Sequence, residues 1–308
     1  MRALAATLAL LAAAAGAAPA RYAGMCDASA AIALNATHFV VADDEHNRLS
    51  IYKRGEPAEV GHVELDAFLN ASKEADLEGA AQMGRRIYWI ASHARNSDGE
   101  VRADRRRFFA TEIRGTTVEP VGQSYTALLD DLLAAPALAP LKLANAAALA
   151  AEADGGFNIE GLAAATDGSL LIGLRNPIPQ GRALVIPLLN PAELVEGKGP
   201  ARFGSALRLD LGGRGIRSID RVGKSYLIAA GPPADKGSFA LFRWSGKAND
   251  VPVPVKADLD TLRPEALFAW PDGRLTLLSD DGGIMVGHKE CKKADPSKRG
   301  FRALDIKP

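Results

Sequence analysis

The segments Asp76-Leu77-Glu78-Gly79 and Asn158-Ile159-Glu160-Gly161 are two copies of a motif that recurs along this chain. Each copy sets a polar residue beside small and apolar ones, and an apolar run follows it within about a dozen residues. The other three copies are Asp27-Ala28-Ser29-Ala30, Gly215-Ile216-Arg217-Ser218 and Arg263-Pro264-Glu265-Ala266. Such repetition at a long period indicates a fold built from one repeated supersecondary unit.

The apolar runs after the copies predict short strands, because they are rich in β-branched, aromatic and leucine residues and often follow a turn such as Asp167-Gly168. These second strands are expected at 39–44, 87–93, 170–175, 226–231 and 275–280. Third strands are expected at 49–52, 108–113, 183–187 and 239–244, and fourth strands at 60–65, 117–121, 206–211 and 251–255. Four short antiparallel strands per repeat are typical of a propeller blade.

We therefore predict an all-β fold, a five-bladed β-propeller of four-stranded antiparallel blades, in which residues 21–308 form one domain. A propeller must close its ring, because open sheet edges invite pairing with other chains. The final strand at 301–306 is expected to complete the fifth blade.

The copies start about 50 residues apart, as four strands with their turns require, except between the second and third copies. The extra residues there have apolar positions that share one helix face: Tyr125, Leu128, Leu129, Leu132 and Leu133. Pro136 and Pro140 would end that helix, and residues 141–152 offer a second one. We expect a helical insert over 124–154 between the second and third blades, acting either as structural cover or as a lid.

The N-terminus predicts a secretory signal peptide over residues 1–20. Arg2 precedes an apolar run that is too short to span a bilayer, and Ala18-Pro19-Ala20 has the small residues of a cleavage site. The alternative is a buried N-terminal helix. The signal peptide predicts an exported protein, periplasmic or secreted.

Cys26 and Cys291 are the two cysteines of the chain. Neither has a cysteine partner at metal-ligand spacing, and an exported protein meets an oxidising compartment. We predict a Cys26–Cys291 disulfide that fastens the first blade to the last.

Composition excludes some partner classes. The 37 basic and 37 acidic residues balance to a formal net charge of zero, which argues against nucleic-acid binding. No later segment is long and apolar enough to predict a membrane span. We expect a monomer.

In a propeller the innermost strands all begin at the same face, so residues in register form a ring. The first predicted ring comprises Ser29, Glu78, Glu160, Arg217 and Glu265. The second lies where the second strands end and comprises Asp44, His93, Arg175, Gly231 and Asp280. The expected ligand-binding side chains are Glu78, Glu160, Glu265, Arg175, Arg217, Asp44 and Asp280.

Three glutamates on one axis repel one another unless cations intervene. Carboxylate oxygens and the amide oxygen of asparagine are ligands that Ca²⁺ prefers. The candidate metal ligands are Glu78, Glu160, Glu265 and Asn158, and calcium is the cofactor that they suggest. The alternative is an ion-pair network, completed by Arg217, Arg175 and Arg263, that fills the channel.

His93 is the histidine of the rings and the candidate for general acid or base catalysis. The alternative is a histidine that is merely hydrogen-bonded near a strand end. The sequence has no zinc-type spacing, no Gly-x-Ser-x-Gly elbow, no P-loop and no dinucleotide fingerprint.

Two basic loops, 92–107 and 282–300, are expected at the same face as the rings, and the helical insert reaches that face too. Arginine and lysine side chains there suit an anionic ligand such as a phosphate ester or a carboxylate. The alternative is a solvated basic run.

The repeats, together with Val41-Ala42-Asp43-Asp44-Glu45, Arg105-Arg106-Arg107-Phe108-Phe109 and Ser279-Asp280-Asp281-Gly282, resemble the bacterial domain-of-unknown-function family thirty-six sixteen. The resemblance covers nearly all of the chain after the predicted signal peptide and implies a β-propeller without an established activity. Glu160-Gly161-Leu162-Ala163 also resembles esterase-like phytases and gluconolactonase-type propellers. In the latter, glutamates at such positions hold a divalent cation.

Three functions remain open from the sequence. The first is an exported propeller that binds a small anionic or metal-bridged ligand at the polar mouth of the channel. The second is a calcium-dependent hydrolase of the phosphoesterase or lactonase type, with His93 moving a proton. The third is a structural or protein-interaction module with a filled channel.

Overall fold

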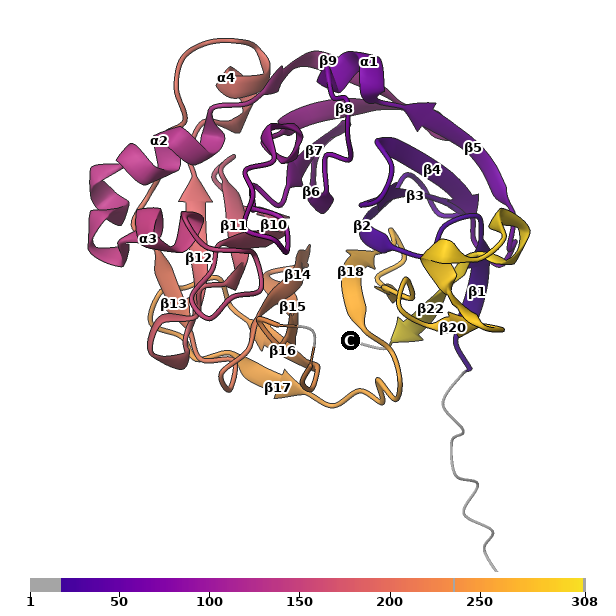
Figure 1. Ribbon diagram of the computed structural model, residues 1–308. Helices are drawn as coiled ribbons and strands as arrows, with labels where there is room; N and C mark the ends of the chain where they lie inside the picture. The colour runs from indigo at the N-terminus through magenta and orange to yellow at the C-terminus, as the bar shows by residue number, and fades with distance from the viewer. Residues whose placement is uncertain (1–17, 235, 307–308) are drawn as a thin grey trace, which may run out of the picture.

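The computed structural model describes residues 18–234 and 236–306, which form five four-stranded antiparallel sheets arranged around a common axis (Figure 1). This confirms the predicted five-bladed β-propeller. In chain order and from the axis outward, the first two blades are β2 (Ala28–Ala33), β3 (His38–Asp43), β4 (Arg48–Lys53) and β5 (Glu59–Glu64), then β6 (Leu77–Met83), β7 (Arg86–Ala91), β8 (Phe108–Arg114) and β9 (Thr117–Tyr125).

The third and fourth blades follow the same order outward. They comprise β10 (Asn158–Ala164), β11 (Leu170–Asn176), β12 (Ala183–Leu188) and β13 (Leu207–Leu209), then β14 (Gly215–Val222), β15 (Ser225–Gly231), β16 (Ala240–Trp244) and β17 (Val253–Val255). The outermost strands β13 and β17 are shorter than the sequence predicts.

The fifth blade is closed by the N-terminal part of the described chain. Its order is β18 (Pro264–Ala269), β19 (Leu275–Ser279), β22 (Gly300–Ile306) and, outermost, β1 (Ala20–Ala23). The prediction that 301–306 completes this blade is therefore wrong, because β22 is its third strand and β1 pairs along it from Ala20 opposite Ala303 to Ala23 opposite Gly300. The blade thus joins both ends of the described chain.

An aromatic cluster packs the closing strand against the first blade. Tyr22 of β1 is 5% exposed, and its ring lies 5.1 Å from that of Phe39 and stacks at 5.4 Å on Phe301. Tyr52 completes the contact, since its hydroxyl donates to the carbonyl oxygen of Ala23 at 2.8 Å. Aromatic side chains bury large apolar areas, so this cluster stabilises the joint between the fifth and first blades.

The disulfide between Cys26 and Cys291 is present, as predicted, with the two Cα atoms 5.9 Å apart. Cys26 lies between β1 and β2, and Cys291 follows the small hairpin of β20 (Met285–Val286) and β21 (Lys289–Glu290). The bond therefore ties that hairpin to the start of the first blade.

Glycines beside the axis let neighbouring blades approach closely. A Cβ on Gly161 would lie 2.8 Å from the Ile216 side chain, and one on Gly79 would lie 2.9 Å from Ile90 and 3.0 Å from Leu162. Contacts this short would force the blades apart, which explains why glycine follows glutamate in the repeats around Glu78 and Glu160.

The insert between the second and third blades is helical and lies at the rim of the molecule (Figure 1). It contains α2 (Leu128–Ala134), the 3₁₀ turn η2 (Pro136–Leu141) and α3 (Leu143–Ala147). The predicted first helix face packs into the core through Leu128, Leu129 and Leu132. Placing Tyr125 on that helix was wrong, because it is the last residue of β9 and α2 begins at Leu128. The expected second helix over 141–152 is wrong in length, because α3 ends at Ala147.

Short helices also occur where none was predicted, α1 (Asp66–Leu69) after the first blade and α4 (Pro191–Val195) between β12 and β13. The other helical turns are η1 (Ala103–Arg105), η3 (Pro179–Gly181), η4 (Cys291–Lys293) and η5 (Pro296–Lys298).

The predicted signal peptide falls largely on residues 1–17, outside the described residues, while β1 begins at Ala20, directly at the expected cleavage site. Within the described part of the chain no helix has the length and apolar character needed to cross a membrane.

If β1 closes the ring, Tyr22→Ala should destabilise the protein by about 3–5 kcal/mol, since a fully packed aromatic side chain is removed. Arg21→Ala on the exposed side of the same strand should change the free energy of unfolding by less than about 1 kcal/mol. Urea denaturation measures both. Equal, small effects of the two substitutions would contradict the closure by β1.

Candidate functional site

Five β-bulges build the ring at the centre of the propeller. In every innermost strand the register with its neighbour shifts at the same place, and the residue left unpaired is the predicted ring residue. A bulge turns such a residue out of the regular alternation of the strand. The five residues are Ser29, Glu78, Glu160, Arg217 and Glu265, and none is more than 8% exposed.

One half of the ring is an ion-pair network. Arg217 contacts Glu265 and lies 3.2 Å from Oε2 of Glu160. Arg175 donates to Oε1 of Glu160 at 2.9 Å and also contacts Glu152 at 2.8 Å. Two arginines therefore compensate the glutamates of the third and fifth blades.

Glu160 is the centre of this network. Besides the two arginines, Nδ2 of Asn158 donates to its Oε1 at 3.0 Å. Although burial lowers the pKa of Arg175, the carboxylates of Glu160, Glu265 and Glu152 raise it overall. Burial raises the pKa of Glu265 to about 8, against the opposing effect of Arg217. Glu160 is therefore the more firmly held carboxylate, and Asn158 serves it as a donor.

The other half of the mouth is acidic. One carboxylate oxygen each from Asp44, Asp76 and Glu78 lie within 4.8 Å of one another. Glu78 is 8% exposed and makes no hydrogen bond or ion pair with any residue that the structure describes. Oδ1 of Asp44 is buried and also finds no partner among the described residues.

Burial raises the pKa of Glu78 well above its ordinary value, and the charges of Glu160 and Asp76 add to the effect. Burial likewise raises the pKa of Asp44, followed by the repulsion of Asp27 and Asp76. Buried carboxyl groups with carboxylate neighbours are held back from ionising unless a cation joins them. In this half of the mouth the effects of burial and mutual repulsion on Glu78 and Asp44 therefore outweigh those of any nearby cation.

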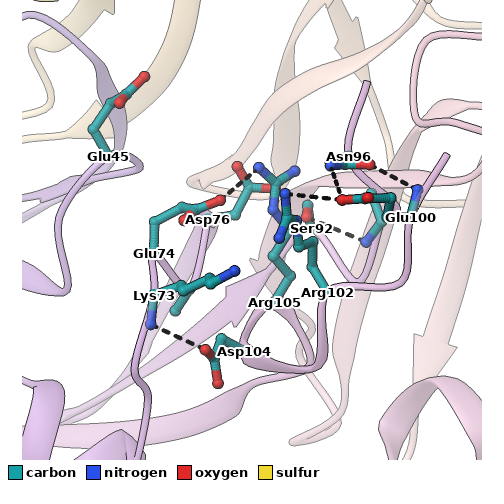
Figure 2. A network of polar contacts seen from close by, with 12 residues as sticks. Glu45, Lys73, Glu74, Asp76, Ser92, Asn96, Glu100, Arg102, Asp104 and Arg105 are labelled. Carbon is teal, nitrogen blue, oxygen red and sulfur yellow. Dashed lines mark hydrogen bonds and ion pairs between the residues drawn. The ribbon is translucent and has the colours of Figure 1, made fainter. Parts of the chain in front are cut away.

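Asp76 is held by Arg105 and Ser92. Arg105 lies 2.9 Å from its Oδ2 and 3.0 Å from Glu74. Figure 2 shows these three side chains together. Burial raises the pKa of Asp76, while Arg105 and a hydrogen bond from Ser92 lower it. Its backbone has φ of 56°, a left-handed conformation that aspartate tolerates better than most residues. Arg105 thus positions Asp76 beside Glu78.

Asp27 and Asp280 extend the acidic half into the joint between the first and fifth blades, where the two residues form an isolated antiparallel bridge. Burial raises the pKa of Asp27 to about 8, and repulsion by Asp280 and Glu45 raises it further, while Lys292 lowers it. Asp27 lies against Gly282, where a Cβ would come within 1.6 Å of its Oδ1. Five acidic residues therefore gather on one side of the mouth.

His93 does not join the ring chemistry. It is 3% exposed, its Nδ1 lies 2.8 Å from the carbonyl oxygen of Ala91, and its Nε2 has no partner among the described residues. Burial lowers its pKa to about 4, and the charged groups that act on it are Arg106, Arg107 and Asp130. None of these is a ring residue, and a neutral buried imidazole at this place suits packing.

The arginines of the 92–107 loop hold the fold together. Arg95 donates to the carbonyl oxygens of Ala147 and Gly99 at 2.9 Å each, so it fixes the helical insert. Arg107 donates to the carbonyl oxygens of Leu69 and Ala103. Glu152, which contacts Arg175, was not among the candidates from the sequence, and Arg105 was expected only as one of several basic side chains in this loop. The run of arginines at 105–107 gave no sign of which one turns to the mouth.

A family model with the description "Protein of unknown function (DUF3616)" matches residues 123–267. The match spans 145 of the 308 residues, a little under half of the chain. The resemblance predicted from the sequence is thereby confirmed, and the DUF3616 segment runs from the end of β9 into β18. None of the curated proteins compared matches the chain.

The solved structures that resemble this chain have low sequence identity to it. A Thermus thermophilus protein described as a "putative oxidoreductase (glucose dehydrogenase)" is 12% identical, with a TM-score of 0.46, over 94% of this chain and 100% of the other. The PQQ-bound aldose sugar dehydrogenase of Streptomyces coelicolor has the same identity and TM-score over 94% and 99%. A mutant of the GH43 protein BlXynB from Bacillus licheniformis is 12% identical, with a TM-score of 0.47, over 84% and 49%.

The two halves of the mouth should respond oppositely to loss of a carboxylate. Without divalent cations, Glu160→Gln should destabilise the protein by about 3–5 kcal/mol, because it removes the buried carboxylate that Arg175 and Arg217 share and so breaks one ion pair of each. Glu78→Gln should leave the free energy of unfolding unchanged or raise it, because it relieves repulsion. Urea denaturation in chelator-treated buffer measures the difference. A comparable loss in both variants would show that Glu78 is also held by cations.

The pH dependence of stability follows from the raised pKa values. Asp27 has a folded pKa of about 8, above its value in the unfolded chain. Its contribution to the free energy of unfolding is therefore fully present below about pH 4 and is lost as the pH rises through 8. Glu78 and Asp44 shift in the same direction. The metal-free protein should lose up to about 3 kcal/mol between pH 5 and pH 8.

Denaturation curves between pH 5 and pH 8 test whether the free energy of unfolding falls as the pH rises. Asp27→Asn should flatten the dependence, whereas the exposed Asp98→Asn should leave it as in the parent. A stability that rises from pH 5 to pH 8 in metal-free buffer would contradict the assignment.

Proposed function

We propose that this protein is an exported propeller that binds a divalent cation, Ca²⁺ by its ligand chemistry, at the acidic half of the channel mouth. Asp44, Asp76 and Glu78 would hold the ion. The observation that carries the proposal is the buried Glu78 carboxylate, which has no partner among the described residues and lies within 4.8 Å of two further carboxylates.

A cation removes the electrostatic cost that this cluster otherwise carries. Carboxylates are hard oxygen ligands, and Ca²⁺ takes about six to eight oxygens in a flexible geometry. Three carboxylates leave coordination positions for other oxygens at the mouth. A small ligand with carboxylate, phosphate or hydroxyl oxygens could occupy these positions, which is the metal-bridged form of the ligand expected from the sequence.

The ion pairs of the ring arginines support a structural role for their half of the channel mouth. Arg175 and Arg217 are engaged by Glu160 and Glu265, so we assign this half to the filled part of the channel. The ion pairs on that side agree with the alternative of a network that fills the channel. The unpaired carboxylates on the acidic side do not agree with it. Nothing among the described residues favours the hydrolase, because His93 lies outside the acidic cluster.

Export is part of the proposal. The predicted signal peptide and the Cys26–Cys291 disulfide agree with an oxidising compartment outside the cytoplasm. We further propose that the protein acts as a monomer.

Isothermal titration of the metal-free protein with CaCl₂ at pH 7.5 should show one binding event. Glu78→Gln and Asp44→Asn should each weaken it at least about tenfold, since each removes a charged ligand from a buried site. Calcium at about 100 times the dissociation constant should raise the free energy of unfolding by about 2.7 kcal/mol.

Glu64→Gln on the outer strand β5 is the matched control and should bind calcium as the parent does. No heat of binding and no change in stability at about 10 mM CaCl₂, well into the range of weak extracellular sites, would refute the cation site.

A further inference from the structure

A cavity of about 600 Å³ opens beside the channel, between the fourth blade and the segment that leads to the fifth. Its walls are β16, β17 and the crossing residues 256–263, and residues 237–239 of the β15–β16 connection border it. Arg263, which precedes the ring residue Glu265 by two positions, belongs to its lining. The cavity is therefore next to the mouth and lies in a different blade pair from the acidic cluster.

The cavity is joined to the ring through Phe239. The guanidinium of Arg217 lies 5.6 Å from the centre of the Phe239 ring. Phe239 also lines the cavity, together with Leu241, Leu259 and Leu262. One wall is thus apolar and is supported from behind by the ion-pair network.

The polar wall is fixed by two arginines from outside the cavity. Arg214 donates to the carbonyl oxygen of Ser238 at 2.9 Å and to its hydroxyl at 2.7 Å. Arg302 donates to the Thr261 hydroxyl at 2.7 Å. Ser238 and Thr261 are therefore held in place before a ligand binds. Binding would then cost little additional conformational entropy in these two side chains.

The backbone of Arg263 is fixed by hydrogen bonds, whereas its guanidinium is available to a ligand. Its N–H donates to the Ser279 hydroxyl at 2.9 Å, and its carbonyl oxygen accepts from the N–H of Asp280 at 2.9 Å. Its guanidinium makes no hydrogen bond or ion pair with the residues that the structure describes, and Lys256 in the same lining makes none with them either.

The charge of the lining is positive. Lys256 and Arg263 contribute two positive charges, and Asp260 contributes one negative charge. The charge of Asp260 also acts on Arg302, whose pKa is raised first by its hydrogen bonds to Asp281 and then by the charges of Asp281 and Asp260. A planar guanidinium with unused donors matches the geometry of a carboxylate or a phosphate.

We infer that this cavity binds a small molecule with a carboxylate or phosphate group and an apolar body. Arg263 and Lys256 hold the anionic group, and Phe239, Leu259 and Leu262 contact the apolar part. The site is separate from the proposed cation site and does not need the ion.

Calorimetric titration with phenyl phosphate and with 3-phenylpropionate, in chelator-treated buffer, tests the inference. Both should bind, and the neutral 3-phenylpropanol should bind more weakly than either. Arg263→Gln should weaken the two anions about tenfold, the effect of removing a hydrogen bond to a charged group. Lys224→Gln, which removes an exposed lysine from the β14–β15 turn, should leave both affinities unchanged.

Three results would overturn the inference. These are no binding of either aromatic anion, equal affinities for Arg263→Gln and the parent, or inorganic phosphate binding as tightly as phenyl phosphate, which would mean an adventitious ion only. Glu78→Gln separates the two sites. It should keep the affinity for both anions while binding calcium more weakly, and a weakening of both would place the anion at the cation cluster instead.

Discussion

The convergence of five innermost strands on one axis is the constraint on which the rest of the structure depends. One bulged residue per blade faces that axis, so every charge placed there meets the charges of its neighbours in a buried setting. Burial strengthens both attraction and repulsion, because the effective dielectric constant falls. The charge of the central residue in one blade is therefore constrained by the central residues of the other blades.

The protein meets this constraint differently on its two sides. Arg217 of the fourth blade is shared between Glu160 and Glu265, so the third, fourth and fifth blades carry a network that fills their share of the channel. The ring residue beside Glu78 of the second blade is Ser29 of the first blade, which carries no charge. Its hydroxyl hydrogen-bonds to the carbonyl oxygens of Leu77 and Ala42. Glu78 is left facing Asp44 and Asp76, and this asymmetry directs the functional hypothesis to one side of the mouth.

The sequence predicted the blades and the ring because both follow from local periodicity, such as the copies around Glu78 and Glu160. It could not predict which ring carboxylates are paired, since Arg175 reaches Glu160 and Glu152 only after the blades are assembled. The direction of His93 also lay beyond sequence reasoning, because its backbone takes a left-handed φ of 55° at the end of a predicted strand. The closing strand was missed because β1 abuts the predicted signal peptide, where four residues carry little strand signal.

The most direct measurement of the central claim is a crystal structure of the protein grown with Mn²⁺ or Ca²⁺ and measured for anomalous scattering. We predict one peak within coordination distance, about 2.3–2.6 Å for Ca²⁺, of carboxylate oxygens from Asp44, Asp76 and Glu78. A channel mouth without a peak, in which Glu78 instead pairs with an arginine or lysine, would contradict it.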